Sequence, residues 1–274
     1  MAKPLAILAV ALLFPPAAAA HLRTGTVAVD YRAQLTRRPL GPVTVGVYQS
    51  DLALHLSVQR GHSVVVYGYL GEPFLRISDG AVTVSKSSPT AAATRVSSHG
   101  MSVVWHDVRA SRSRWSVPIA VDGRLTVIQG VTDRRPRPSL ALWAVALGAF
   151  AVVVFVLRSP VAAGVVSSLA AIVVAAAFAL GTYASPGTWI AGVDEVIFAA
   201  AGVGVLRWGP PSARLPSALW LSLLGVAIGL SKGEVFLHAI VLSALPGALV
   251  RALTVVAIGA GIAGGALTWR AYAR

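Results

Sequence analysis

A histidine that becomes the first residue of a mature protein can chelate a metal ion through two nitrogens, its α-amine and its imidazole. In this chain His21 follows a run of alanines that closes a short apolar leader. An apolar core from Leu5 to Phe14, too short to span a bilayer, and small residues up to Ala20 are typical of a signal peptide. We therefore expect residues 1–20 to be removed and His21 to be exposed outside the cytoplasm.

The paired nitrogens of a terminal histidine suit a borderline metal such as Cu(II), because both lose their proton at moderate pH. A mature N-terminal histidine on a β-rich domain resembles the start of the copper-resistance C-type periplasmic proteins and of the copper subunit of particulate methane monooxygenase. The resemblance implies copper as a cofactor and His21 as a ligand. The alternative is that His21 follows the cleavage site by coincidence and binds nothing.

A second concentration of reactive side chains is the run Trp105-His106-Asp107-Val108-Arg109. In an extended strand His106 and Asp107 point to opposite faces, so both could bind one metal ion only if a bulge intervened. The alternative is a hydrogen-bonded strand histidine beside a salt bridge between Asp107 and Arg109. A predicted loop residue, His99, has the freedom to reach a ligand. The candidate metal ligands are therefore His21, His99, His106 and Asp107.

The start of that run resembles the tryptophan-histidine-aspartate signature of uncharacterised secreted proteins that combine a sandwich domain with a membrane tail. In those proteins a second histidine commonly follows, whereas this chain has Val108 in that place. The resemblance implies the same two-part architecture. It also implies a histidine site with one donor fewer.

The composition requires part of the chain to lie in a membrane. Of 274 residues, 56% are hydrophobic and 12% are charged, and the mean hydropathy is +0.74, which is too apolar for an ordinary soluble domain. There is no cysteine, so disulfides, thiolate metal sites, Fe–S clusters and a cysteine nucleophile are excluded. The net charge of +13 would suit nucleic acid, but predicted secretion makes anionic lipid or solubility the better explanation.

The composition changes sharply near Ser139. Residues 21–138 contain about 15 Lys or Arg and 7 Asp or Glu, and their period-2 alternation predicts seven to nine short strands. An Asp122-Gly123 turn joins the last two of these strands. We expect residues 21–138 to form an extracytoplasmic all-β domain, an antiparallel sandwich of immunoglobulin-like type.

Residues 139–274 predict an all-α membrane bundle of about five transmembrane helices. The expected spans are residues 139–157, 160–183 and 189–206, a fourth that begins at Pro216, and residues 247–269. Five spans place Arg158, Arg207 and Arg214 on the cytoplasmic side together with the C-terminal arginines, whereas six would export the C-terminal ones. The positive-inside rule therefore favours five spans and an N-terminal domain outside the cytoplasm.

Two groups of polar residues interrupt the predicted spans. Counting along the helices places Asp194 and Glu195 about 7 Å below the outer surface. The same count places Lys232 about 24 Å above the inner surface, in the same outer third of a core about 30 Å thick. On a continuous helix Glu234 and His238 would share a face. The predicted intramembrane polar cluster is thus Asp194, Glu195, Lys232, Glu234 and His238.

This intramembrane polar cluster allows three interpretations. Lys232 pairs with Asp194 or Glu195 and pins two helices together. Alternatively, the acids and His238 form a metal site or a proton relay, since intramembrane acids with a histidine are what such paths need. In the third interpretation the topology is different, and residues 231–234 form an exposed loop.

The chain lacks the motifs of common enzymes. It has no Gly-x-Ser-x-Gly elbow, no phosphate-binding glycine loop and no His-Glu-x-x-His, so an enzyme is not favoured. The glycines of the last span indicate helix packing, with Gly261 and Gly265 at the small-xxx-small spacing; this group is Gly259, Gly261, Gly264 and Gly265.

Two functions follow from these observations. The first is a membrane-anchored factor that binds and delivers copper outside the cytoplasm. The second is a structural or interaction subunit of an envelope membrane-protein complex, without a metal. In either case the expected partners are the lipid bilayer and another envelope membrane protein, and not nucleic acid.

Overall fold

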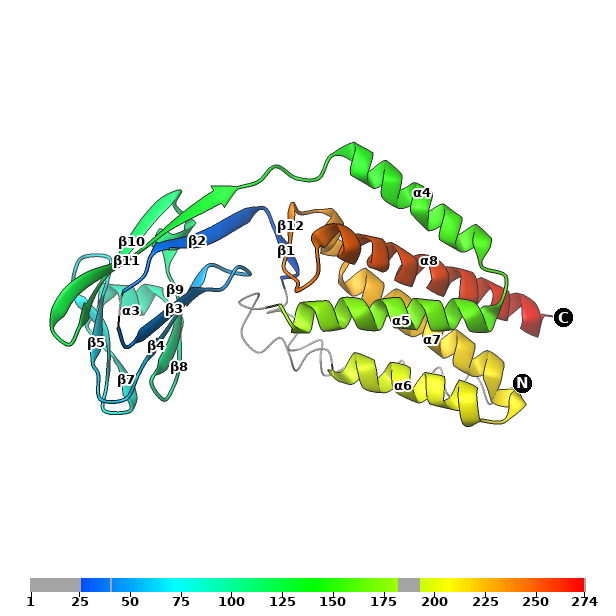
Figure 1. Cartoon of the computed structure of the whole chain (residues 1–274), viewed down its shortest axis with the longest axis horizontal. Helices are drawn as coiled ribbons and strands as arrows, with labels where there is room; N and C mark the ends of the chain where they lie inside the picture. The colour runs from blue at the N-terminus through cyan, green and yellow to red at the C-terminus, as the bar shows by residue number, and fades with distance from the viewer. Residues whose placement is uncertain (1–25, 40, 182–192, 274) are drawn as a thin grey trace. The chain divides into compact units, whose positions relative to one another are not determined.

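A computed structural model describes residues 26–39, 41–181 and 193–273 of the chain (Figure 1). The chain divides into two compact units. The first, called the β domain here, is Asp30–Arg135. The second, called the membrane unit, combines the described residues up to Val29 with those from Pro136 onward.

The β domain consists of two antiparallel sheets, as the alternation of its sequence predicts. One sheet has six strands in the order β2-β11-β10-β5-β6-β7, and the other has four in the order β3-β4-β9-β8. The six-stranded sheet contains β2 (Tyr31–Arg37), β5 (Val64–Tyr67), β6 (Pro73–Ser78), β7 (Ala81–Val84), β10 (Arg114–Val121) and β11 (Arg124–Arg134). The four-stranded sheet contains β3 (Val43–Val47), β4 (Ala53–Val58), β8 (Val96–His99) and β9 (Ser102–His106). A short helix, α3 (Pro89–Ala93), and a 3-10 turn, η2 (Val108–Ser111), connect them.

The two sheets share one hydrophobic core because each strand turns alternate side chains inward. Leu56 and Trp105 enter the core from the four-stranded sheet, and Val66 and Ile119 enter it from the six-stranded sheet. The ring of Trp105 meets Phe74 edge-on, with ring centroids 6.5 Å apart. This buried layer fixes the outward positions on both sheets, and those of the four-stranded sheet carry His55, His99 and His106.

The membrane unit consists of helices and one small pair of strands. Its helices are α4 (Leu140–Val156), α5 (Pro160–Ala179), α6 (Val193–Trp208), α7 (Arg214–Ser231) and α8 (Gly247–Tyr272). Three described helical segments are long and apolar enough to cross a membrane, namely Pro160–Ala179, Pro211–Ser231 and Gly247–Tyr272. The predicted change from a β-rich to a helical, membrane-compatible region near Ser139 is therefore confirmed.

Small residues let α5, α7 and α8 approach closely. A Cβ added to Gly261 would lie 2.6 Å from the carbonyl oxygen of Ser222, and a Cβ added to Gly264 would collide with the Ser222 hydroxyl. The Ser167 hydroxyl donates a 2.6 Å hydrogen bond to the Ala257 carbonyl and so ties α5 to α8. Nothing lies within 4 Å of a Cβ added to Gly265. The expected pair Gly261 and Gly265 is thus replaced by Gly261 and Gly264, because α5 and α7 lie on the side that Gly264 faces.

The segment just before the β domain belongs to the membrane unit. Its strand β1 (Ala28–Val29) pairs antiparallel with β12 (Ile240–Val241), which lies between α7 and α8. The Leu242 amide extends the pairing with a 2.9 Å hydrogen bond to the Val27 carbonyl. Val27 is only 5% exposed and belongs to the same buried cluster as Phe178 and Val250. The chain therefore enters the β domain from a fixed point in the membrane unit.

The polar stretch after α7 is not a continuous helix. α7 ends at Ser231, a 3-10 turn η5 (Gly233–Phe236) follows, and β12 comes next. Glu234 and His238 therefore do not share one helix face, although they are four residues apart. The break matches the interruption that the sequence shows at Lys232.

The close approach of α5 and α7 gives a test with a matched control. A Cβ added to Gly225 would collide with the Ser167 hydroxyl, so Gly225→Ala should lower the stability of the purified protein in detergent by about 1 to 3 kcal/mol. Gly265→Ala adds the same methyl group in open space and should leave the melting temperature unchanged or slightly raised. Equal losses in the two variants, measured by thermal unfolding, would contradict this packing.

Candidate functional site

The Asp107 carboxylate is buried at the end of β9, and its side chain is 0% exposed. It accepts hydrogen bonds from the Trp105 indole at 3.1 Å and from the Arg109 backbone amide at 3.0 Å. The Arg109 guanidinium adds a bidentate contact, with Nε at 2.9 Å and Nη2 at 2.7 Å. Four protein donors thus occupy this carboxylate. Asp107 and Arg109 form the salt bridge that the sequence offered as the alternative to a metal ligand.

Arg109 links this ion pair to the turn between β5 and β6. Its terminal nitrogens donate 3.3 Å hydrogen bonds to the carbonyl oxygens of Tyr67 and Gly68. Its guanidinium carbon lies 5.0 Å from the centre of the Tyr69 ring, a cation–π contact. A bidentate, stacked guanidinium is a geometry that lysine cannot reproduce, so Arg109 acts as a fixed brace between the two sheets.

The Glu72 carboxylate forms a second polar centre near this brace. It accepts hydrogen bonds from the Ser88 hydroxyl at 2.6 Å, the Thr90 hydroxyl at 2.8 Å and the Leu70 amide at 3.0 Å. The hydrogen bond from Ser88, followed by that from Thr90, lowers the pKa of Glu72 to about 2. A Cβ at Gly68 would collide with both Glu72 and Thr90, so this position requires glycine.

No sequence pattern indicates the Glu72 network directly. Residues 87–100 have the composition of a long loop, yet Ser88 caps the short helix α3 and faces Glu72. The available signal was Ser88 followed by Pro89, a pair typical of a helix start. The remaining partners meet only through the fold.

The β-domain histidines lie in separate environments. His106 Nε2 is 2.7 Å from Asp51 Oδ2, and His62 Nδ1 is 2.8 Å from Asp122 Oδ2. His99 pairs with Ser102 at the far end of β9, away from His106. Within the described residues no three His, Asp or Glu side chains gather closely enough to hold a metal ion. His21 lies outside the described residues.

One pair of histidines does share a surface. In the four-stranded sheet His55 pairs with Val104, and Ala53 pairs with His106, so both histidines are on the outer face of adjacent strands. Such diagonal neighbours have Cβ atoms about 7 to 8 Å apart, within reach of long side chains. The burial of His55 lowers its pKa, which favours the neutral imidazole.

The predicted intramembrane polar cluster is described only in part. Lys232 is 8% exposed, and its Nζ lies 5.5 Å from the centre of the Phe178 ring. Glu234 is exposed and His238 is half-buried. Asp194 and Glu195 begin α6, but their side chains lie outside the described part of the structure. The pairing of Lys232 with either acid therefore stays a prediction.

Arg251 is a structural residue that was not among the candidate site residues predicted from the sequence. From the first turns of α8 its Nε donates a 2.8 Å hydrogen bond to the Val235 carbonyl. Its Nη2 donates to the carbonyls of His238 at 2.9 Å and Ala239 at 3.0 Å. The sequence signal was a lone arginine near the outer end of the last span, opposite to the positive-inside pattern. Its position is explained by the non-helical backbone that it stabilises.

The depressed pKa of Glu72 predicts a pH-dependent stability. Because the pKa is about 2 in the folded protein and 4.5 ordinarily, the ionised carboxylate stabilises the fold above about pH 4.5. This contribution is lost as the pH falls towards 2. The stability difference between the wild type and Glu72→Gln, measured by thermal unfolding, should be largest above pH 4.5 and shrink towards pH 2.

The serines beside Glu72 provide the control for that experiment. Ser88→Ala removes the shortest hydrogen bond to the carboxylate and should shift the loss of stability to higher pH. Ser87→Ala removes a neighbouring hydroxyl that contacts Ser85 instead, and it should leave the pH profile unchanged. A pH-independent gap between the wild type and Glu72→Gln would contradict the assignment.

The chain matches no known protein family, no curated protein and no solved structure. Its resemblances to copper-binding proteins with an N-terminal histidine and to secreted proteins with the tryptophan-histidine-aspartate signature stay predictions. A function must therefore be inferred from the residues of this chain: the Asp107–Arg109 brace, the outward-facing side chains of the two sheets, and the fastening of β1 in the membrane unit.

Proposed function

We propose that this protein is a multi-pass subunit of the cell envelope that presents its β domain outside the cytoplasm to another envelope membrane protein. In this proposal the β domain is an immunoglobulin-like sandwich and all helices from α4 to α8 cross the membrane. The signal peptide is removed and no metal is required. The protein acts by binding rather than by catalysis.

The connections of the β domain to the membrane unit carry this proposal. β1 precedes the domain and α4 follows it, and both belong to the membrane unit. The two connecting ends leave side by side, because Tyr31 pairs with Arg134 and the Arg135 amide donates a 2.8 Å hydrogen bond to the Asp30 carbonyl. The β domain is thus joined to the membrane unit at both ends of its own sequence. This suits a module that displays a surface to a partner in the same membrane.

Charge and aromatic residues in the membrane unit support the orientation. The α4–α5 connection, the α6–α7 connection and the end of α8 lie at one end of the unit, opposite β1 and β12 (Figure 1). Arg158, Arg207, Arg214 and Arg270 lie at or beside these connections. Trp208 and Trp269 lie at the same end and are 82% and 76% exposed, as expected of an interfacial aromatic belt. This end is the cytoplasmic one in our proposal.

The absence of cysteine makes the orientation testable with single introduced thiols. Ser116→Cys, on the outer face of the six-stranded sheet, should react with a membrane-impermeant maleimide in intact cells. Ala273→Cys, after α8, should react only after the cells are permeabilised. Labelling of Ala273→Cys in intact cells would contradict both the five-span arrangement and the proposed orientation.

The same thiols test the binding role. A photoactivatable crosslinker attached through Ser116→Cys or through Ser97→Cys, which is exposed on the four-stranded sheet, samples the two outer faces separately. We expect a discrete adduct with one membrane protein from one face only. No adduct from either face, or indiscriminate adducts from both, would contradict an interaction subunit.

Copper delivery is a second candidate function, favoured by the shared face of His55 and His106. These imidazoles and the amine and imidazole of His21 are nitrogen donors of the kind that Cu(II) prefers. His106 would have to exchange its contact with Asp51 for the metal. In this proposal the β domain captures copper and the membrane unit passes it on or docks the recipient.

Titration of the purified mature protein with Cu(II) tests this candidate. We expect about one bound ion, and weaker binding as the pH falls through the imidazole range, because protons compete for the same nitrogens. His106→Ala and an extra residue ahead of His21 should each weaken binding sharply, whereas His62→Ala should not. If neither change alters the affinity for Cu(II), then His21 and His106 are not its ligands.

A further inference from the structure

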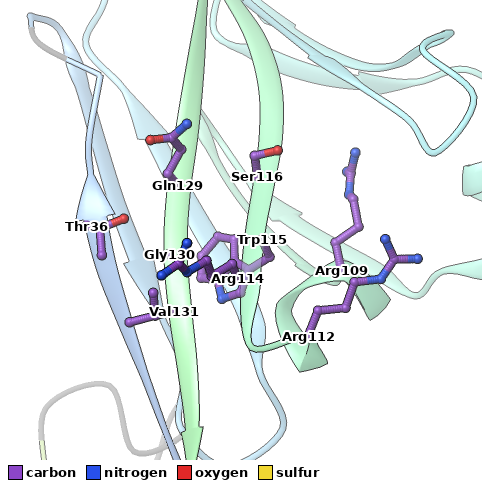
Figure 2. Close-up of a pocket in the computed structure, with 9 residues that line it drawn as sticks. All are labelled: Thr36, Arg109, Arg112, Arg114, Trp115, Ser116, Gln129, Gly130 and Val131. Carbon is purple, nitrogen blue, oxygen red and sulfur yellow. The ribbon is translucent and has the colours of Figure 1, made fainter.

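The outer face of the six-stranded sheet carries an arginine-rich groove of about 660 Å³ (Figure 2). Side chains from β2, β10, β11 and the η2 turn line it. The lining residues are Thr36, Arg109, Arg112, Arg114, Trp115, Ser116, Gln129, Gly130 and Val131. The groove contains three arginines and no carboxylate in its lining.

Two of these arginines are available to a ligand. Arg112 and Arg114 are exposed, and neither forms an ion pair with a described residue. Arg109 is different, because Asp107 holds its guanidinium and neutralises its charge. The groove therefore retains two positive charges on guanidinium groups that no described acid compensates, beside a third guanidinium that is rigidly braced.

The register of the sheet places neutral donors beside these charges. Arg114 pairs with Val131 and Ser116 pairs with Gln129, so all four side chains belong to the outer face. The register between β11 and β2 shifts at Gln129, which leaves Thr36 as the extra residue of a bulge. A guanidinium, two hydroxyls and an amide thus line one concave surface.

This set of donors matches the chemistry of a phosphate group. Guanidinium groups bind phosphate oxygens through paired, charge-assisted hydrogen bonds, and hydroxyl and amide groups can complete the shell. A nucleobase is a poorer match, because the aromatic side chain in the lining, Trp115, is only 5% exposed and packs over Gly130. The groove selects for charge and for oxygen acceptors rather than for a flat ring.

Three carboxylates of the β domain are bound by other protein groups, which strengthens the preference of the groove for an anion. Asp51 contacts His106, Asp122 contacts His62, and the Glu72 carboxylate is bound by hydroxyl and amide donors. These carboxylates are therefore directed to partners other than the exposed arginines. Arg37 on β2, opposite Gln129, adds further positive charge on the same outer face, whereas Arg32 lies opposite Asp133. An approaching anion therefore meets a mainly positive surface, on which Asp133, opposite Arg32, is an exposed acid.

We propose that this arginine-rich groove binds the phosphate group of an anionic ligand outside the cytoplasm. The proposal rests on the proposed function for its location and deepens it by naming the chemistry that the β domain recognises. A phospholipid headgroup and free inorganic phosphate both carry this group, and both offer the same oxygens to the donors of the groove.

The test uses the full chain in nanodiscs of neutral phosphatidylcholine, titrated with inorganic phosphate against a chloride control. We expect saturable, salt-sensitive binding that Arg112→Gln with Arg114→Gln weakens about tenfold or more. Arg60→Gln with Arg95→Gln removes the same charge outside the groove and should change the affinity by less than about twofold. If both double variants weaken phosphate binding equally, the effect comes from net charge alone and the proposed site is wrong.

Vesicles distinguish the two sources. A lipid headgroup is the source if the chain binds vesicles that contain phosphatidylglycerol more tightly than phosphatidylcholine vesicles and if soluble phosphate competes with that binding. Binding of inorganic phosphate without a preference for phosphatidylglycerol indicates the free ion. Binding of neither probe overturns the proposal. Arg112→Gln alone, in a turn outside the strands, keeps the test valid if the Arg114 variant misfolds, as judged by its melting temperature.

Failure of this proposal and failure of the proposed function give different results. Phosphate binding by the purified protein does not depend on the side of the membrane that the β domain occupies. Maleimide labelling of Ser116→Cys in intact cells depends only on that side. An outside domain without phosphate binding rejects the groove alone, whereas an inside domain with phosphate binding rejects the proposed location alone.

Discussion

The membrane unit depends on the hydrogen bonds that one guanidinium donates to the non-helical backbone between α7 and α8. Between α7 and α8 the chain leaves the helical hydrogen-bond pattern, so its carbonyl groups need donors from outside that segment. Arg251 provides these donors to Val235, His238 and Ala239. The turn that it holds contains β12, β12 receives β1, and β1 leads directly into the β domain. The entry point of the β domain is thus fixed through Arg251.

The β domain uses charge in a related way. Asp107 and Arg109 join the end of β9 to the β5–β6 turn, and Glu72 joins that turn to α3. Both carboxylates are surrounded by protein donors, which meets the requirement that a buried charge be paired or hydrogen-bonded. Removing Arg109 would leave the buried Asp107 charge uncompensated and should cost about 3 to 5 kcal/mol. Asp107 and Arg109, which belong to the run singled out in the sequence, therefore brace the fold. Arg112 and Arg114, which the sequence did not single out, are exposed.

Periodicity explains what the sequence could predict. Strict alternation marked the strands of the β domain, and long apolar runs marked α5, α7 and α8, because both patterns follow from local geometry. The opposite orientation of His106 and Asp107 also follows from strand geometry, and their separate partners, Asp51 and Arg109, agree with it.

Contacts between distant segments could not be read from periodicity. Glu72 meets Ser88 only because α3 folds back onto the β5–β6 turn. Gly264 rather than Gly265 contacts α5 and α7 because the direction of neighbouring helices decides which side of α8 is covered. The pairing of β1 with β12 could not be predicted either, because nothing in two short apolar segments indicates that they are strand partners. The groove around Arg114 likewise requires the register of three strands.

The β1–β12 pair also sets an order for assembly in the cell. Its two strands are separated by about 210 residues, so at a synthesis rate of about 5 to 20 residues per second β1 waits about 10 to 40 s for its partner. During that interval the β domain has left the ribosome and can complete its own sheets, whose strands are close in sequence. Insertion of α7 and α8 then delivers β12 to the waiting strand. The β1–β12 pair can therefore form only after the β domain that lies between its two strands has been made.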